Sequence, residues 1–448
     1  MKLTKIGEFL NRSKIPVDIQ DNLQYNRVTI RINHNGVSLR DSEVGKKIGT
    51  KKQFILKAGQ FIVSKIDARY GAFGIAPIEV DNAIITGNFW AYDVDTNLIN
   101  IDWFNQFTNS PVFYEVCERA SSGITHRKYL DEKFFLNYQI LLPSVKEQLI
   151  QIDKINSQKV TFGELSSELS HQLTLVKKLR QQLLQDAVQG KLVEQNKSRK
   201  DSGETGSELL KKIKAEKAKL IAEGKLKKEK PLPPIKPEEI PFEIPDNWVW
   251  CRLGEICSIK GGKRVANGYK LLKEPTPHIY IRVSDMKNGT VDDSDLHYLD
   301  ETMFQKIKQY TISKEDIYMT IVGGTIGKCG LIPDIFDNMN LTENAAKISP
   351  ILVDKVYLWK CLDSPFCQDQ FIDKTKQVGV QKMALNRFSC SLIPLPPLSE
   401  QNRIVEKLDE LMQYCDNLEE SIKESQAQNE KLLQQVLREA LRKEEVKK

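Results

Sequence analysis

The residues whose spacing comes nearest to that of a reactive site form a glycine-rich loop, which runs from Gly323 to Cys329. A phosphate-binding loop needs a glycine five positions before the glycine of its Gly-Lys pair, and a hydroxyl side chain directly after the lysine. Val322 and Cys329 occupy those two positions in this chain. The loop therefore lacks groups that would hold phosphate and magnesium, and a structural turn is the better interpretation.

Two further patterns also fall short of a catalytic site. An N6-adenine methyltransferase holds its target amine in an Asp/Asn-Pro-Pro-aromatic loop, whereas Pro233-Pro234 and Pro396-Pro397 are both flanked by aliphatic residues. The triplet Asp131-Glu132-Lys133 resembles the end of a nuclease motif, but such triplets are common on protein surfaces. We therefore expect this chain to carry no catalytic residue.

The eight cysteines and five histidines do not form a metal-binding pattern. Cys251 and Cys257 are separated by five residues, as are Cys361 and Cys367, and this is not the spacing of a zinc finger. The histidines supply no companion ligands. We expect reduced, structural thiols and neither a metal nor an organic cofactor.

The elements that organise the chain are two copies of one long stretch. When Pro143–Val188 is shifted by 253 residues without a gap it lies on Pro396–Leu441, and 11 of the 46 positions are identical. Similarity held in one register over that length indicates an internal duplication. Neither copy has a proline after its opening turn, and each carries an early glutamate, Glu147 or Glu400, where negative charge stabilises a helix N-terminus. The repeat therefore predicts two long helices.

Apolar residues recur in both copies at spacings of three and four, which is the heptad pattern of a coiled coil. The residues predicted to pair the helices or to dock other subunits are Ile155, Phe162, Leu165, Leu169, Leu179, Leu183, Leu408, Leu411, Leu418, Ile422, Leu432 and Val436. Polar Gln172 and Ser425 interrupt the two seams at one place, with Asn429 one step further in the second copy. These polar residues either fix the register or partner of the helices or form a solvated turn. A single helix cannot bury such a seam, so the simplest solution is an antiparallel coiled coil of the two copies.

Two globules of one plan are predicted to alternate with these helices. The first is expected to hold a helix over Ile101–Glu118 and strands over Arg27–Ile32, Phe54–Leu56, Gln60–Ser64, Phe73–Pro77, Ala83–Ile85 and Phe89–Tyr92. Positions that recur at an offset of 256 are Gly71/Gly327, Gly74/Gly330, Pro77/Pro333, Thr86/Thr342 and Asn88/Asn344. Elsewhere the globules differ widely, notably Gln20–Thr50 against Gly261–Leu299. One scaffold with two different surfaces is expected if each globule reads a different target.

The predicted fold class is α+β, with two mixed α/β globules, two long helices and a pseudo-twofold internal repeat. The expected divisions are a globule over 1–142, a helix over 143–196, a charged and proline-rich linker over 197–244, a second globule over 245–395 and a second helix over 396–448. The linker prolines predict an extended, semi-rigid segment. With no long apolar run and no signal-peptide pattern at the N-terminus, we expect a cytoplasmic protein without a membrane partner.

The net charge of +6 is concentrated in one segment. Residues 197–236 hold 13 basic and 6 acidic residues, a local charge of +7 that leaves −1 for the other 408 residues. The basic excess therefore belongs to the linker, and the global charge is only a weak indication of nucleic-acid binding by the globules.

The chain resembles the specificity subunits of type I restriction–modification systems. The resemblance rests on Pro396-Pro397-Leu398-Ser399-Glu400-Gln401 at the start of the second helix, on Glu243-Ile244-Pro245-Asp246-Asn247-Trp248 followed by Leu253-Gly254-Glu255, and on the alternating layout. It implies two target recognition domains, each binding one half of a split, asymmetric site on double-stranded DNA. It also implies that the helix pair sets the gap between the half-sites and docks two methyltransferase subunits, to which restriction subunits add.

The resemblance makes DNA contacts the expected role of loops that project from the globules. Base readout favours Arg, Lys, Asn, Gln, Ser and Thr, and phosphate contacts favour basic residues. The candidates are Lys65, Arg69, Tyr70, Thr125, His126, Arg127, Lys128, Lys260, Lys263, Arg264, Lys328, Gln381 and Lys382. For any one of them, an ordinary solvated surface is an equally good interpretation.

A different class of function also fits the sequence. A coiled-coil scaffold whose globules bind protein or glycan would need no basic field on the globules. A free-standing methyltransferase or nuclease is disfavoured, because the motifs that either chemistry requires are missing. Salt-dependent DNA binding separates the first alternative from a DNA-recognition subunit.

Overall fold

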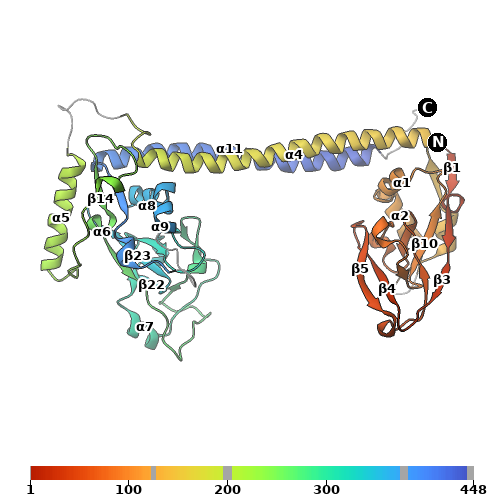
Figure 1. The fold of residues 1–448 in the computed structure, drawn as a ribbon, viewed down its shortest axis with the longest axis horizontal. Helices are drawn as coiled ribbons and strands as arrows, with labels where there is room; N and C mark the ends of the chain where they lie inside the picture. Colours follow the sequence, from red (N-terminus) through yellow and green to blue (C-terminus); the bar gives the residue numbers. More distant parts are fainter. Residues whose placement is uncertain (1, 123–127, 195–203, 374–381, 441–448) are drawn as a thin grey trace. The chain divides into compact units, whose positions relative to one another are not determined.

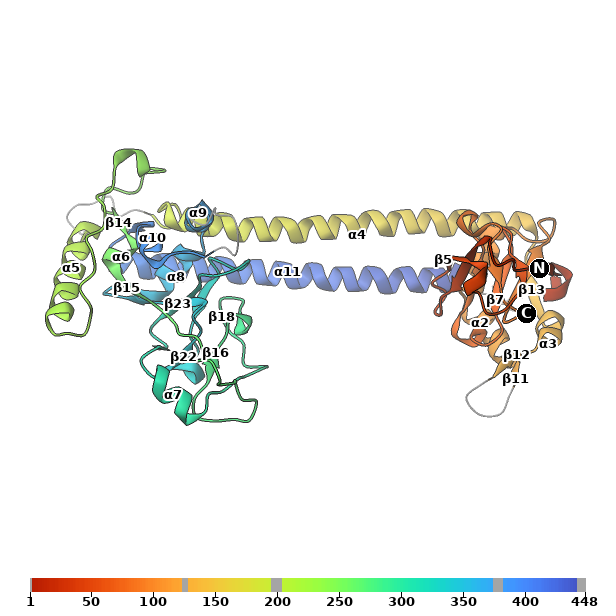
Figure 2. The same ribbon diagram turned by 60° about the horizontal axis from the view of Figure 1, so that its bottom comes forward.

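The computed structural model describes residues 2–122, 128–194, 204–373 and 382–440, and the chain divides into two compact units (Figures 1 and 2). The first unit comprises Met1–Ser170 with Lys423–Lys448, and the second comprises His171–Ile422. Each unit therefore contains one globule together with a part of each long helix. The mixture of helices and strands confirms the predicted α+β class.

The first globule is built on a four-stranded antiparallel sheet in the order β2-β10-β7-β8 and a five-stranded sheet in the order β3-β6-β9-β4-β5. Its strands are β1 (Lys2–Lys5), β2 (Leu10–Ser13), β3 (Ile15–Asp18), β4 (Gln24–Ile30), β5 (Val37–Val44), β6 (Lys52–Ile55), β7 (Phe61–Ser64), β8 (Phe73–Ile75), β9 (Ile84–Ile85), β10 (Phe89–Val94), β11 (Ser121–Ser122), β12 (Tyr129–Leu130) and β13 (Gln139–Leu142). Its helices are α1 (Ile101–Thr108), α2 (Pro111–Arg119) and α3 (Glu132–Asn137).

Aromatic side chains dominate the core of this globule. Phe61, Phe104 and Phe113 are fully buried where the four-stranded sheet meets α1 and α2. The rings of Phe73 and Phe113 meet edge to face with centroids 4.9 Å apart, which is a preferred arrangement for aromatic pairs. The core therefore fixes the sheet against the two helices and holds the loops at the sheet ends in place.

The second globule has a sheet of the same kind, in the order β15-β23-β20-β21. Its strands are β14 (Val249–Arg252), β15 (Cys257–Gly261), β16 (Tyr280–Ile281), β17 (Met286–Lys287), β18 (Thr290–Val291), β19 (Thr311–Ile312), β20 (Ile317–Thr320), β21 (Cys329–Leu331), β22 (Met339–Leu341), β23 (Ala345–Pro350) and β24 (Leu392–Leu395). Its helices are α6 (Leu253–Ile256), α7 (Glu301–Ile307), α8 (Lys355–Asp363), α9 (Pro365–Asp373) and α10 (Leu385–Phe388).

The strands predicted for the first globule are confirmed as β4, β6, β7, β8, β9 and β10 to within a few residues, but the helix predicted over 101–118 is wrong as one element. It is interrupted between α1 and α2, where Ser110 caps α2 and Pro111 takes its first turn. Proline lacks the N–H that an uninterrupted helix would use, and its ring clashes with the preceding turn. The Ser-Pro pair therefore starts a new helix.

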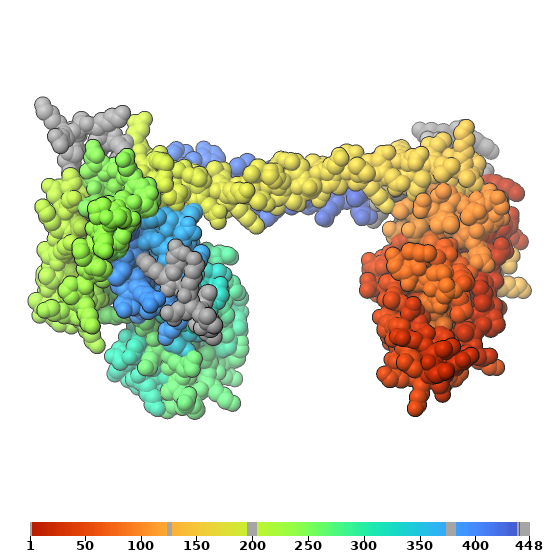
Figure 3. Space-filling view, in the orientation of Figure 1, coloured from red at the N-terminus to blue at the C-terminus, as the bar shows by residue number. Residues whose placement is uncertain are grey.

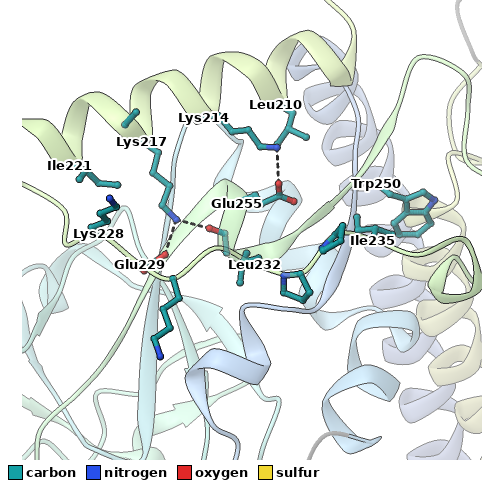
Figure 4. Close-up of a pocket in the computed structure, with 15 residues that line it drawn as sticks. Leu210, Lys214, Lys217, Ile221, Lys228, Glu229, Leu232, Ile235, Trp250 and Glu255 are labelled. Carbon is teal, nitrogen blue, oxygen red and sulfur yellow. Dashed lines mark hydrogen bonds and ion pairs between the residues drawn. The ribbon is translucent and has the colours of Figure 1, made fainter.

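The charged segment before the second globule packs on that globule. Helix α5 (Gly206–Ala222) buries Leu209 and Ile213, and Lys217 donates hydrogen bonds to the carbonyls of Gly254 at 2.6 Å and Cys257 at 3.1 Å. Figure 4 shows Lys217 also paired with Glu229, 3.0 Å away. The proline-rich stretch closes a groove of about 500 Å³ beside α5. The prediction of an extended stretch agrees with the absence of helix or strand over residues 227–236, but the segment is attached to the globule.

Two long helices complete the chain, α4 (Val145–Val188) and α11 (Leu398–Ala440). With a rise of about 1.5 Å per residue, the 44 residues of α4 extend over about 66 Å. Among the helices of the described residues, none combines the length and the apolar character needed to cross a membrane.

Candidate nucleic-acid interface

The two globules present one junction of three loops at corresponding places. In the first, the Lys65 N–H donates to the Asn88 carbonyl at 2.9 Å, and the Leu130 N–H donates to the Lys65 carbonyl at 2.8 Å. In the second, the Ile321 N–H donates to the Asn344 carbonyl at 2.8 Å, and the Met383 N–H donates to the Ile321 carbonyl at 2.9 Å. Within each globule, these backbone bonds therefore bring three segments together. They are the segment after β7 or β20, the one before β10 or β23, and the one before α3 or α10.

Glycine is required beside each junction. Gly71 has φ of +80°, and a Cβ there would lie 2.3 Å from the Tyr114 hydroxyl. Gly327 has φ of +91°, and a Cβ there would lie 2.5 Å from Gln368 Oε1. These glycines let the turn approach a helix of its own globule, α2 in the first and α9 in the second. The glycine-rich stretch 323–328 joins antiparallel β20 and β21, whereas a phosphate-binding loop leads from a strand into a helix, so its geometry is that of a turn.

The structure gathers the candidates of the first globule around aromatic rings. Lys65 is half-buried, with its Nζ 5.7 Å from the centroid of the Tyr129 ring. The guanidinium of Arg69 lies 4.5 Å from the centroid of the Tyr70 ring, and Tyr70 is 49% exposed. Lys128 is half-buried next to the short strand β12. Such cation–ring pairs hold flat, positively charged surfaces that suit nucleic acid. Thr125, His126 and Arg127 lie outside the described residues.

In the second globule the candidates fall on two stretches. Lys260 ends β15, and Lys263 and Arg264 follow it, all three exposed. Arg264 Nε lies 2.6 Å from Glu343 Oε1, and this hydrogen bond raises the pKa of the arginine. Lys328 and Lys382 are exposed, and a bridge between Val322 and Lys382 brings the latter beside the β20–β21 turn. Gln381 lies outside the described residues.

Glu343, Asn88, Asn344 and Tyr129 are at the junctions although they were not among the sequence candidates. The offset of 256 residues that relates Asn88 to Asn344 was the signal that could have found two of them. Tyr280 supports the same surface, because its hydroxyl donates to the Lys263 carbonyl at 2.9 Å. Burial raises the pKa of Tyr280 to about 12, so it remains a neutral donor.

Within the described residues, no group of three or more His, Cys, Asp or Glu side chains could hold a metal ion. Seven of the eight cysteines are buried, and Cys390 is half-buried. The Sγ atoms of Cys361 and Cys367 are 3.9 Å apart, and burial raises the pKa of thiols such as Cys117 and Cys257. Protonated, buried thiols act as small apolar side chains.

Away from the ends that pack on the globules, the buried positions of each long helix recur at intervals of seven or fourteen residues. They are Ile155, Leu169 and Val176 on α4, and Leu408, Cys415, Ile422 and Asn429 on α11. Phe162, Leu183, Leu411 and Val436 of the predicted seam are half-buried. Leu165, Leu179, Leu418 and Leu432 of the predicted seam are 46%, 44%, 50% and 51% exposed. These four leucines form a second apolar row, which the described part of the chain leaves largely exposed.

Polar contacts join parts of the two helices within each unit. In the first unit, Asn429 Nδ2 donates to the Phe162 carbonyl at 3.1 Å. In the second unit, Arg180 lies 2.7 Å from Asp416 and 3.0 Å from Glu419. Asn429 is nearly buried on the heptad position, and it is the polar residue that the sequence placed one step beyond Ser425 in the interrupted seam.

A buried glutamine fastens the start of each long helix to its globule. Gln148 accepts from the Asn100 N–H at 2.7 Å and donates to the carbonyls of Leu98 at 3.0 Å and Pro143 at 2.8 Å. Gln401 accepts from the Asp354 N–H at 2.9 Å and donates to the Pro396 carbonyl at 2.9 Å. Asn100 and Asp354 are the N-caps of α1 and α8. We call these two arrangements the glutamine joints.

The globules and helices define an α+β fold that known structures share. The crystal structure of the HsdS subunit from Thermoanaerobacter tengcongensis aligns with a TM-score of 0.51 and 16% identity, covering 98% of this chain and 96% of that one. A structure described as the basis of complex assembly and conformational transition of the type I R-M system aligns with a TM-score of 0.53 and 16% identity, covering 98% and 97%. At this identity, the likeness shows the fold alone.

Sequence comparison gives the family. Residues 245–426 match the family model described as the type I restriction modification DNA specificity domain. The EcoAI specificity subunit of Escherichia coli is 30% identical over 378 residues, which cover 73% of this chain and 62% of that protein. The EcoEI specificity subunit of the same organism is 25% identical over 380 residues with the same coverage, so the match spans less than two thirds of either relative. Over these spans the chain is similar to the specificity subunits of type I restriction–modification systems.

Proposed function

We propose that this chain is the DNA-recognition subunit of a type I restriction–modification complex, and that each globule binds one half of a bipartite, asymmetric site on double-stranded DNA. The observation that carries the proposal is one loop junction repeated in two globules, Lys65–Asn88–Leu130 and Ile321–Asn344–Met383, with basic side chains beside each. A repeated scaffold with differing surfaces suits the reading of two different half-sites.

The proposed DNA contacts remain those expected from the sequence. In the described residues, half-buried Lys65 and Arg69 of the first globule lie over tyrosine rings, and the basic candidates of the second globule are exposed. The first kind of placement favours stacking and base contact, while the second favours phosphate contact.

We propose that α4 and α11 arose by internal duplication and pair as an antiparallel coiled coil that acts as a spacer. Support comes from the common buried heptad position and from contacts in which residue numbers rise along α4 while they fall along α11. In the first unit these join Phe162 to Asn429 and Ser170 to Gln426. In the second unit they join Arg180 to Asp416. Length and register of such a pair would fix the gap between the half-sites.

The exposed leucines of the long helices are proposed docking points for two methyltransferase subunits, to which restriction subunits add. Leu165 and Leu179 on α4 correspond to Leu418 and Leu432 on α11 at the offset of 253 residues, so the two helices offer two equivalent apolar rows. Catalysis and cofactors would then belong to those partners, and the chain itself would act without chemistry of its own beside cytoplasmic DNA.

The proposed domains are the two recognition globules over 1–142 and 245–395, the spacer helices over 143–196 and 396–448, and the segment 197–244 between them. The contacts of Lys217 support treating the later part of that last segment as a strap of the second globule rather than as a free linker.

A methylome tests the proposal. The chain is expressed with and without a type I methyltransferase subunit in a methylation-free host, and N6-methyladenine is mapped by single-molecule sequencing. We expect a split motif with a fixed gap, seen only when both proteins are present. A folded, co-purifying pair that produces no motif would overturn the proposal.

The alternative is a scaffold whose globules bind protein or glycan. The exposed leucine rows favour a partner protein, and the globules lack a general basic excess. DNA affinity that falls steeply with salt is expected for the recognition subunit, because phosphate contacts release counterions. Absence of DNA binding at low salt by the assembled complex would favour the scaffold.

A further inference from the structure

A two-stranded ribbon stands at the edge of the first globule, where the two globules differ. Strands β4 and β5 pair along their whole length, and β5 is an edge strand of its five-stranded sheet. The ribbon is packed near the turn that joins its strands, where Val28 and Val37 are only 6% and 8% exposed. Gln24, Asn26 and Ser42 are exposed. The described part of the second globule has no paired strands of this length.

A β-bulge in the ribbon leaves one arginine without an opposite residue in the strand register. Arg27 is opposite Asp41 and Val28 is opposite Leu39, so Arg40 is the extra residue on β5. A bulge bends the strand and gives its extra side chain a new direction. The Arg40 side chain is 62% exposed, and its nearest carboxylate, Asp41, lies 3.5 Å away and already accepts two bonds from Arg27, at 2.6 and 2.8 Å. Such an exposed pair holds Arg40 only weakly.

The tip of the ribbon is fastened to the loop that carries two of the candidate residues. The Asn33 N–H donates to the Tyr70 carbonyl at 2.6 Å, and the His34 N–H donates to the Gly71 carbonyl at 3.0 Å. His34 Nε2 lies 2.8 Å from Thr108 Oγ1, at the end of α1. The ribbon therefore forms one rigid surface with Arg69 and Tyr70.

The positive charge of this globule lies in the same segment. Residues 1–142 hold 18 basic and 15 acidic residues, and residues 24–52 alone hold 7 of the basic and 2 of the acidic ones. The rest of the globule therefore has 11 basic and 13 acidic residues and is slightly negative. In Figure 3, red residues of the N-terminal segment cover the end of this unit that lies away from α4, and others run up its side towards that helix. An anionic partner of the first globule would be attracted to that end.

We propose that the β4–β5 ribbon enters the DNA major groove and reads bases of one half-site, with Asn26 and Arg40 as its specificity-determining residues. This rests on the proposed function and assigns it to an element that the loop candidates do not include. The major groove admits a two-stranded β-ribbon, Asn pairs with adenine through two hydrogen bonds, and Arg pairs with guanine in the same way. The packing of Val28 and Val37 holds the exposed end of the ribbon in a fixed orientation.

The test uses the full chain with its methyltransferase partner in a methylation-free host. Asn26→Ala and Arg40→Ala are compared with the unsubstituted chain and with Lys133→Ala, which removes an exposed charge from α3 of the same globule. We expect each ribbon variant to relax one base position of the same half-site, by about 10-fold in the preference for the original base. The other half-site and the gap should stay unchanged, and their presence in the motif shows that the complex is folded.

Two outcomes overturn the inference. One is that both ribbon variants keep the original motif and methylation level, as expected of Lys133→Ala. The other concerns a variant that abolishes methylation. Its purified complex is then tested for binding to duplexes in which one or the other half-site is randomised. Equal loss of recognition at both half-sites overturns the inference, while loss confined to one half-site supports it. A chain that yields no motif before any substitution refutes the proposed function instead.

Discussion

Replacing Gln401 by alanine should loosen the start of α8 in the second unit. The Gln401 side chain is fully buried, and it accepts from the Asp354 N–H and donates to the Pro396 carbonyl, both at 2.9 Å. Alanine removes both partners and leaves two buried backbone groups unpaired. Each such group costs about 1–3 kcal/mol, so we expect about 3 kcal/mol in total, with some relaxation of the site.

Hydrogen exchange of the full chain, read by mass spectrometry, measures this loss locally. Because Asp354 is the N-cap of α8, its amide and the first turn of α8 should become less protected. About 3 kcal/mol corresponds to roughly 100-fold faster exchange. The neighbouring and exposed Asn402 provides the control, since Asn402→Ala removes a side chain outside the joint.

The second glutamine joint makes the test reciprocal. Gln148→Ala should accelerate exchange at Asn100 and over α1, and it should leave α8 unaffected, because its hydrogen bonds go to Leu98, Asn100 and Pro143. Exchange over α8 that changes less than about three-fold in Gln401→Ala, or equally in both variants, would refute the view that each glutamine fastens its own helix to its own globule.

Three further results are expected. Burial lowers the pKa of His34 below its usual 6.5, so this histidine binds a proton more readily in the unfolded chain than in the folded one. The stability of the first unit should therefore be complete above about pH 6.5 and decline below it. His34→Gln should flatten this decline in urea titrations followed by hydrogen exchange. Arg180→Ala removes a half-buried guanidinium from two carboxylates at 2.7 and 3.0 Å, and should lower stability by about 1 kcal/mol, with a smaller effect at 1 M salt in thermal melts. Gly327→Ala should cost about 2 kcal/mol in urea unfolding, more than Gly323→Ala; both glycines have positive φ, but only at Gly327 does the new Cβ meet Gln368 Oε1. Equal losses of stability in the two glycine variants would mean that strain from the positive φ, and not the contact with Gln368, is the whole effect.

The sequence predicted the parts of this fold that repeat. The offset of 253 residues located both long helices, and the offset of 256 residues identified the matched turns at Gly71 and Gly327, because both turns need a glycine with positive φ. It did not predict the break at Pro111, because the apolar pattern continues across it. It left open whether Leu165 and its counterparts pair the helices or dock another subunit, because heptad spacing is the same for a pair of helices and for a face that a further protein covers.

The candidate site was less predictable, since loop positions follow from long-range contacts. Lys65 could be suspected from its glycine-flanked loop, but its place over the Tyr129 ring depends on the backbone bond between Leu130 and Lys65, which are 65 positions apart in the chain. Arg40 carried no signal in the sequence. Its exposure results from a bulge, and a bulge changes strand pairing without a fixed residue pattern.

The residues that reveal the family and the residues proposed to read DNA serve different purposes. Glu400 accepts from Asn247 Nδ2 at 2.8 Å, so the Pro-Leu-Ser-Glu-Gln and Pro-Asp-Asn-Trp stretches meet in the structure. With Gln401 they fasten helix to globule, and none of them belongs to the proposed reading surfaces. A chain of this layout can therefore exchange its ribbon and loops while the joints stay intact. Resemblance in the joints thus assigns the family and leaves the target bases to be determined by the surfaces in which the two globules differ.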